Sequence, residues 1–338
     1  MHVDPKPKVL ILNTPHKISD GYLSIMNEMA DVHSIEQASH DVLAERIAEA
    51  VKEKGPFVAF VVFIRWWDTP LPWPYDEALL GPLIETGCRM ITAGGAGYDW
   101  ADMKYLTANR VYYANTPIMA GRRTADTTAM MILQALRGTS EREADARAGK
   151  FYDSTKPFAK DARSSTLGIV GLGTIGKLVS EHMQHFGMKV IYHNRSRLPA
   201  EEENGAVYVS FELLLLRSDV ISLHCPLNEG THHLFNKQVF DQMNDGTIIV
   251  NTSRGAVIDE NALVEALDSG KVRCAALDVY ENEPNIHPGL INSKHTILSP
   301  HCAVANETFE RDQQIEVMLN LETFLKSGKP INAVNSFV

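Results

Sequence analysis

The sequence predicts an α/β protein built from two doubly wound parallel-sheet domains with a cleft between them. Short apolar runs alternate with helical stretches along the chain. Continuous apolar runs are typical of strands buried on both faces, and their alternation with helices is typical of a parallel sheet covered by helices. The length of 338 residues exceeds the usual size of a single core and therefore favours two domains.

The predicted strands fall into two blocks that are separated by a long helical stretch. The first block holds the runs 8–12, 57–64 and 89–92. The second block holds the runs 166–170, 188–193, 219–225, 246–252, 274–279 and 295–300. Because each block can form its own sheet, we expect one unit to end near residue 117 and a second to continue to about residue 300.

Two stretches outside these strands predict helices. The segment 124–152 begins with the apolar helical pattern "TADTTAMMILQALR" and then becomes polar and charged. The tail 306–330 carries apolar residues near helical spacing and ends in "SGKP", which stops a helix. We expect the first helix to join the two blocks.

Composition and charge exclude several classes of protein. Apolar residues make up 44% of the chain and charged residues 22%, which is typical of a globular protein. The formal net charge of -10 argues against a surface built for nucleic acid or anionic lipid. No run reaches the ~18 apolar residues of a membrane helix, and "MHVDPKPKVLIL" lacks the apolar centre of a signal peptide. We expect a cytoplasmic protein.

The cysteines predict neither a disulfide frame nor a metal site. Cys88, Cys225, Cys274 and Cys302 are scattered and form no CxxC pair. This spacing favours reduced thiols over zinc ligands. We therefore predict no metal.

A glycine-rich turn in the second block predicts a dinucleotide site. Gly171, Gly173 and Gly176 follow the strand 166–170 and open a helix, and the next strand follows at 188. In such a unit the first glycine permits a tight turn, the second lets the backbone approach a pyrophosphate, and the third lets helix and strand pack closely. The alternative, a glycine turn that only packs, does not require all three elements in register.

The stretch after the next strand suggests which dinucleotide binds. Asn194 lies where an acid usually binds the ribose hydroxyls, and Arg195, Ser196 and Arg197 follow it. A neutral amide removes the repulsion of a 2'-phosphate, and the arginines could clamp that phosphate with charge-assisted bonds. NADP(H) is therefore favoured and NAD(H) is possible; the alternative is a solvated charged loop.

Three polar residues follow strands of the second block and predict hydride-transfer chemistry. Arg254, Glu283 and His301 each come just after an apolar run, where open sheets collect ligand residues. Singly they could be a surface ion pair, a loop acid and a buried histidine. Jointly they are the groups needed to move a hydride and a proton between a nicotinamide and an anionic carbonyl compound.

The motifs "GLGTIG", "VNTSRGAVIDENAL", "LDVYENEP" and "SPHCA", in this order, resemble the D-isomer-specific 2-hydroxyacid dehydrogenase family over nearly the whole chain. In the first block, "ITAGGAGYDWADM" resembles the family's substrate loop and "YANTP" its crossing into the cofactor domain. "IYHNRSRLPAEEE" and "GAGYDW" look like fungal glyoxylate/hydroxypyruvate reductases and D-mandelate dehydrogenases. The resemblance implies a flavodoxin-like substrate-binding domain of residues 1–117 plus 305–338, and an NAD(P)-binding Rossmann domain of residues 118–304.

The resemblance implies NADPH-dependent, reversible reduction of a 2-oxo acid to the D-2-hydroxy acid, with glyoxylate, hydroxypyruvate or a bulkier acid such as benzoylformate as substrate. His301 would be the general acid, Glu283 would hold its imidazole and favour the protonated form, and Arg254 would bind the carboxylate and carbonyl oxygen. Backbone N–H groups of Gly95, Ala96 and Gly97 would complete the carboxylate site. The cofactor would also contact Thr174, Ile175, Cys225, Pro226, Thr231, Thr252, Ser253, Asp278 and Ala303.

Two features leave alternatives open. Cys302 and Ala303 depart from the glycine that the family often has after the histidine, so the wall beside the nicotinamide could differ. Arg65 and Trp66, with the aromatic residues Trp67, Trp73 and Tyr75, could face the substrate and favour a bulky acid, or could simply pack their loop.

Other functions are less compatible with the sequence. An NAD-preferring D-mandelate-type dehydrogenase and a dinucleotide-sensing, corepressor-like binding protein are the alternatives. A formate dehydrogenase would have Gln at the position of Glu283. The family resemblance also implies a homodimer formed through helices of the cofactor domain.

Overall fold

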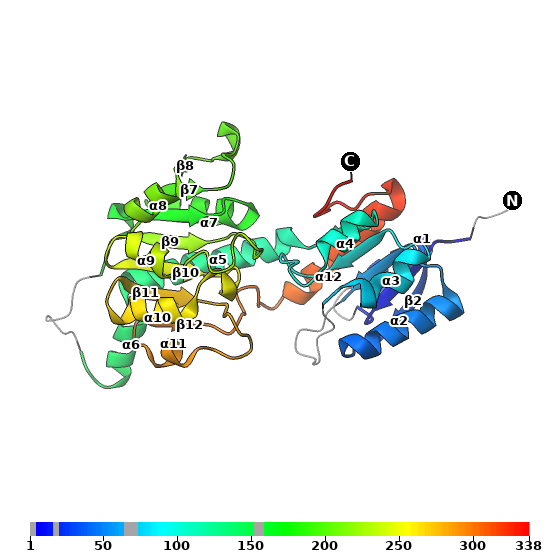
Figure 1. The fold of residues 1–338 in the computed structure, drawn as a ribbon, viewed down its shortest axis with the longest axis horizontal. Coiled ribbons are helices and arrows are strands. Elements are labelled where there is room, and N and C mark those ends of the chain that lie inside the picture. Colours follow the sequence, from blue (N-terminus) through cyan, green and yellow to red (C-terminus); the bar gives the residue numbers. More distant parts are fainter. Residues whose placement is uncertain (1–4, 16–19, 64–73, 152–158, 338) are drawn as a thin grey trace. The chain divides into compact units, whose positions relative to one another are not determined.

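The computed structural model describes residues 5–15, 20–63, 74–151 and 159–337. The chain divides into two compact units, residues 1–120 with 306–338 and residues 121–305. Figure 1 shows a sheet flanked by helices in each of them. None of the helices in the described ranges combines the length and hydrophobicity needed to span a membrane.

The first unit is a five-stranded parallel sheet with the order β2-β1-β3-β4-β5. Its strands are β1 (Lys8–Leu12), β2 (Asp31–Ile35), β3 (Ala59–Val62), β4 (Met90–Ala93) and β5 (Tyr112–Ala114). Its helices are α1 (Asp20–Met29), α2 (His40–Lys54), α3 (Glu77–Glu85), α4 (Met103–Ala108) and α12 (Phe309–Ser327).

Helices cover both faces of this sheet because its central strands β1, β3 and β4 are almost entirely apolar and buried. Leu10 and Leu12 pack in one cluster with residues of α2, α3 and α4. Val9 and Ile11, which alternate with them, pack in another cluster with residues of α1 and α12. Successive side chains of a strand point to opposite faces, so this alternation buries both sides of the sheet.

The second unit is a seven-stranded parallel sheet with the order β12-β11-β10-β9-β6-β7-β8. Its strands are β6 (Thr166–Val170), β7 (Lys189–His193), β8 (Val207–Tyr208), β9 (Val220–Leu223), β10 (Thr247–Asn251), β11 (Val272–Leu277) and β12 (Thr296–Leu298). Its helices are α6 (Thr139–Arg147), α7 (Thr174–His185), α8 (Phe211–Arg217), α9 (Lys237–Gln242), α10 (Glu260–Asp268) and α11 (Pro288–Asn292). Helix α5 (Pro117–Arg137) begins in the first unit and continues in the second.

The order of the second sheet reverses beside β6, since β7 lies on one side of it and β9 on the other. In open parallel sheets, ligands bind beyond the carboxyl ends of the strands at such a reversal. The turns after β6, β9 and β10 therefore lie where a dinucleotide site is expected.

The predicted fold class is confirmed, and each predicted strand overlaps an observed one. The sequence analysis missed β2, β5 and β8, which end their sheets. These strands are short or partly exposed, so their sequences lack a long continuous apolar run. Phe186 lies just after α7 and is 48% exposed.

Candidate functional site

The glycine turn between β6 and α7 has the geometry that a pyrophosphate requires. Gly171 has a φ of 99°, and a Cβ there would come within 2.8 Å of the backbone of His224 and Cys225. A Cβ at Gly176 would overlap the carbonyl oxygen of Gly171. Gly173 precedes the first turn of α7 and faces open space. The backbone N–H groups of Thr174 and Ile175 at this helix start can therefore receive an anion.

Asn194 is part of the glycine turn. Its Oδ1 accepts a hydrogen bond of 2.7 Å from the backbone N–H of Leu172. The bond fixes the turn to the end of β7 and leaves the Nδ2 amide as the group that Asn194 can offer to a ligand. Sequence analysis placed Asn194 near the ribose but did not predict this second contact.

The two arginines after Asn194 have different surroundings. Arg197 donates to Glu203 through Nε at 2.8 Å and Nη2 at 3.1 Å, and Glu203 also accepts from the Tyr192 hydroxyl at 2.9 Å. Hydrogen bonds from Arg197 and Tyr192 lower the pKa of Glu203 below its ordinary value. Arg197 is therefore engaged by Glu203 in this structure, and its expected contact with a phosphate stays a prediction. Arg195 and Ser196 are exposed, and Arg195 makes no ion pair within the described chain.

The loop after β9 supplies the next predicted cofactor residues. Thr231 donates from Oγ1 to the carbonyl of Pro226 at 2.6 Å, so the two residues belong to one closed loop. Cys225 is buried, and burial raises the pKa of its thiol to about 11. Burial also lowers the pKa of His224 to about 4, so this imidazole beside the glycine turn is neutral at pH 7. Both side chains are therefore uncharged there.

The turn after β10 positions Arg254. Asn251 is buried at the strand end; its Oδ1 accepts from the N–H and hydroxyl of Ser253, and its Nδ2 donates to the carbonyl of Arg254 at 2.8 Å. Thr252 bonds through its hydroxyl to Thr128 of α5 at 2.8 Å. Sequence analysis missed Asn251 and Thr128. A polar residue closing the apolar run of β10 was the available signal for Asn251, whereas nothing local indicated Thr128.

Glu283 and His301 form a direct pair. Their side chains are joined by 2.7 Å between Nδ1 and Oε2, and the other carboxylate oxygen of Glu283 accepts from the N–H of Tyr280 at 2.9 Å. Burial acts to raise the pKa of Glu283, but the bond to His301 and the charge of Arg254 outweigh it, so the pKa lies below its ordinary value. The histidine side chain is 44% exposed, and its pair with the carboxylate leaves Nε2 for another partner.

Asp278 holds the segment that carries His301. One oxygen accepts from the Ser299 hydroxyl at 2.6 Å and the Cys302 N–H at 3.0 Å, and the other accepts from the Ala303 N–H at 2.9 Å. His301 has a φ of 50° and donates its N–H to the carbonyl of Asp278. Asp278 is 1% exposed, so in this structure its carboxylate is an internal anchor, and its expected contact with the cofactor stays a prediction.

The predicted carboxylate site of the first unit is placed after β4. The N–H of Gly95 donates to the Thr116 hydroxyl at 2.7 Å, and its expected contact with a substrate stays a prediction. The N–H groups of Ala96 and Gly97 make no hydrogen bond within the described chain, and Asn115 fixes their loop through the carbonyl of Ala96.

The aromatic hypothesis is tested at one residue only. Arg65 and Trp66, like Trp67 and Trp73, lie outside the described residues. Tyr75 is fully buried among core residues such as Leu79 and Tyr113, so it packs the first unit and faces no open pocket.

The comparisons with known proteins agree with the motifs. Residues 129–303 match the profile of the D-isomer specific 2-hydroxyacid dehydrogenase, NAD binding domain. The chain is 42% identical to 4-methyl-2-oxopentanoate reductase A of Aspergillus oryzae over 274 residues, 81% of this chain and 83% of the relative.

Two solved structures are similar over almost the full length. A glyoxylate reductase from Paecilomyes thermophila has a TM-score of 0.88 and 33% identity, covering 98% of both chains. The apo form of Rhodotorula graminis D-mandelate dehydrogenase has a TM-score of 0.87 and 32% identity, covering 99% of both chains. The chain therefore belongs to the D-isomer-specific 2-hydroxyacid dehydrogenase family and is an oxidoreductase that uses a nicotinamide dinucleotide.

Proposed function

We propose that this protein reduces a 2-oxo acid to the D-2-hydroxy acid with NADPH, and that Arg254, Glu283 and His301 carry the reaction. The observation that carries the proposal is the 2.7 Å bond between His301 and Glu283, next to the strand end that holds Arg254. The names of the relatives, which are reductases of 4-methyl-2-oxopentanoate and glyoxylate, support the substrate class.

Each of the proposed catalytic residues has a separate role in the reaction. A bound nicotinamide supplies the hydride. His301 gives the Nε2 proton to the carbonyl oxygen, and Glu283 orients the ring through its bond to Nδ1. Arg254 binds the substrate carboxylate through its planar fork, which fixes the orientation of the carbonyl. The N–H groups of Ala96 and Gly97 stay predicted donors for a substrate carboxylate.

The glycine turn fits the cofactor, since Gly173 faces open space and the α7 start has free N–H groups. The rest of the cofactor site is formed by Cys225, Pro226, Thr231, Thr252, Ser253 and Ala303.

Of the alternative functions, the corepressor-like protein is not favoured, because it needs no paired acid and histidine. An NAD-preferring enzyme remains the second candidate. The cytoplasmic location and the absence of nucleic-acid partners stay predictions.

Steady-state reduction of a 2-oxo acid panel tests the function. Glyoxylate, hydroxypyruvate, 4-methyl-2-oxopentanoate and benzoylformate are compared with NADPH and NADH side by side. We expect turnover with the panel and a preference for NADPH. A preference for glyoxylate would contradict a pocket adapted to bulky acids. Negligible turnover together with tight cofactor binding would contradict the reductase itself.

The preference for NADPH depends on Arg195. We expect Arg195→Ala to weaken NADPH binding by about 2 kcal/mol, or about 30-fold, and to spare NADH, because only NADPH offers a 2'-phosphate to the guanidinium. Dissociation constants from nicotinamide fluorescence measure the change. Arg197→Ala is the matched control: it removes the same charge two residues away, but from a side chain that Glu203 already engages. If Arg195→Ala weakened the binding of NADPH and NADH equally, residues 194–197 would be a solvated loop without a role in cofactor selection.

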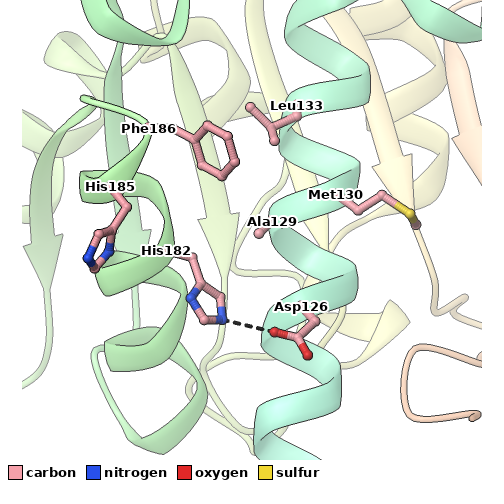
Figure 2. A pocket seen from close by; sticks show the side chains of 7 residues that line it. All are labelled: Asp126, Ala129, Met130, Leu133, His182, His185 and Phe186. Atoms are coloured by element: carbon pink, nitrogen blue, oxygen red, sulfur yellow. Dashed lines mark ion pairs between the residues drawn. The ribbon is translucent and has the colours of Figure 1, made fainter.

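We further propose that the protein is a homodimer that associates through α5 and α7. These helices flank a hollow of about 340 Å³ lined by Ala129, Met130, Leu133, Phe186 and three polar residues (Figure 2). Met130 is 51% exposed and Phe186 is 48% exposed, which is unusual for side chains of this size so close together. A second copy of the chain is the partner that the family resemblance implies.

Replacing Met130 with Glu should separate the two copies, because the charge would be buried without a partner. Light scattering should give twice the chain mass of 37.5 kDa for the parent and a single mass for M130E. Ile291→Glu, at a residue of α11 that is 57% exposed, should leave the dimer intact. A parent protein with the mass of one chain would contradict the proposed homodimer.

A further inference from the structure

Three side chains outside the proposed catalytic set converge in the second unit. His232, His233 and Glu281 each offer one ligand atom, and these atoms all lie within 4.8 Å of one another. The two imidazole rings stack with centroids 4.0 Å apart and an interplanar angle of 28°. Nε2 of His233 lies 2.8 Å from Oε1 of Glu281. No local sequence pattern indicated this cluster, because 48 residues separate His233 from Glu281.

Backbone hydrogen bonds hold the cluster in place. The N–H of His233 donates to the carbonyl of Ala256 at 2.8 Å, and the following Phe235 donates to Val257 at 3.0 Å. The N–H of Glu281 donates to the carboxylate of Glu260 at 2.9 Å. His233 has a φ of 50°, which is an uncommon conformation for a residue with a side chain. The surrounding strands and loops therefore fix the backbone on which these side chains are carried.

The composition of the cluster matches one class of ligand. Two neutral imidazoles and one carboxylate are the donor set that zinc and its neighbours in the transition series bind, with a fourth position left for water. Ca²⁺ and Mg²⁺ prefer oxygen ligands only. With bonds of 2.0–2.1 Å, the ligand atoms of a tetrahedral zinc site lie about 3.3 Å apart. Since His232 is exposed, rotation of its ring can bring its nitrogen to that separation.

We propose that His232, His233 and Glu281 form a binding site for a divalent transition metal such as Zn²⁺. The expectation of no metal came from the spacing of the cysteines and considered thiolate ligands only, whereas this set contains none. The site is independent of the hydride-transfer chemistry. It nevertheless joins the segments that carry that chemistry: Ala256 lies two residues after Arg254, and Glu281 lies two residues before Glu283.

Zinc binding to the full chain, without a histidine tag and after removal of metals by chelation, tests the proposal. Calorimetric titration with ZnCl2 should give one saturable site, and the Tm should rise with zinc. His232→Ala and Glu281→Gln should each weaken the affinity by at least about ten-fold. His232 is exposed, so its replacement should leave the Tm of the metal-free protein unchanged. MgCl2 should not compete.

Two controls separate this site from adventitious binding. His295→Ala removes another histidine that pairs with a glutamate, Glu141, and Cys302→Ser removes an exposed thiol. Both variants should bind zinc as the parent does. The proposal is overturned by a parent without saturable binding, by His232→Ala or Glu281→Gln with parental affinity, or by loss of binding in either control.

Discussion

Replacing His301 with Ala should lower kcat by about 10²- to 10⁴-fold, the usual contribution of a positioned acid or base. The imidazole is the group whose free nitrogen can give a proton to the carbonyl oxygen, while Glu283 holds the other nitrogen at 2.7 Å. Without the ring, water must protonate the developing alkoxide. Stopped-flow or steady-state reduction of the best 2-oxo acid at saturating NADPH measures the loss.

Cofactor affinity should separate a chemical role for His301 from a structural one. The segment around it is fixed by Asp278 through backbone N–H groups of Cys302 and Ala303, and these bonds do not need the imidazole. NADPH should therefore bind to His301→Ala as it does to the parent. Cys302→Ala, at the neighbouring exposed position, should keep most of the turnover. Near-normal turnover in His301→Ala would remove this residue from the role of the acid.

Gly255→Ala should destabilise the fold by at least about 3 kcal/mol, the upper range for overpacking, because the neighbours are backbone and cannot rotate away. A Cβ at Gly255 would overlap the carbonyl group of Tyr280 and the amide nitrogen of Glu281. The chain must then separate the turn that carries Arg254 from the segment that carries Glu283. The free energy of unfolding in urea measures this cost, and kcat/KM should fall as well.

Gly230→Ala is the matched control for this substitution. It lies in the same unit, its φ is not in the left-handed region, and the nearest atom to an added Cβ is Asn228 Oδ1 at 3.4 Å. Its free energy of unfolding should change by less than about 0.5 kcal/mol. A Gly255→Ala variant as stable and as active as the parent would show that the two segments are not tightly packed.

The sequence predicted the parts of the fold that burial determines. The central strands, such as β6 and β10, are buried on both faces and so read as continuous apolar runs. The edge strand β2 has the half-exposed sequence "DVHSI", which carries no such signal. Its existence depends on pairing with β1, a contact between distant residues that no local pattern encodes.

In the candidate site, too, local features could be predicted from the sequence and contacts between distant residues could not. The glycines of the turn and the polar residues at strand ends can be recognised from local sequence patterns. The structure brings two of these residues, Glu283 and His301, into direct contact. Hydrogen-bond partners were harder to foresee. Glu203 engages Arg197, and Thr116 engages the N–H of Gly95, so two groups assigned to ligands already have protein partners. Which donors stay free depends on tertiary neighbours, and those neighbours were not visible in the motifs themselves.

The bond between Asn194 and Leu172 has a consequence for how cofactor use can change during evolution. The acceptor in that bond is a side-chain oxygen that aspartate also has, so exchanging the two residues keeps the glycine turn anchored. What changes is the charge at the position that we propose faces the ribose. The codons of Asn and Asp differ at one base, so a single mutation at this position can alter selection between the phosphorylated and unphosphorylated dinucleotide while the scaffold around it stays folded.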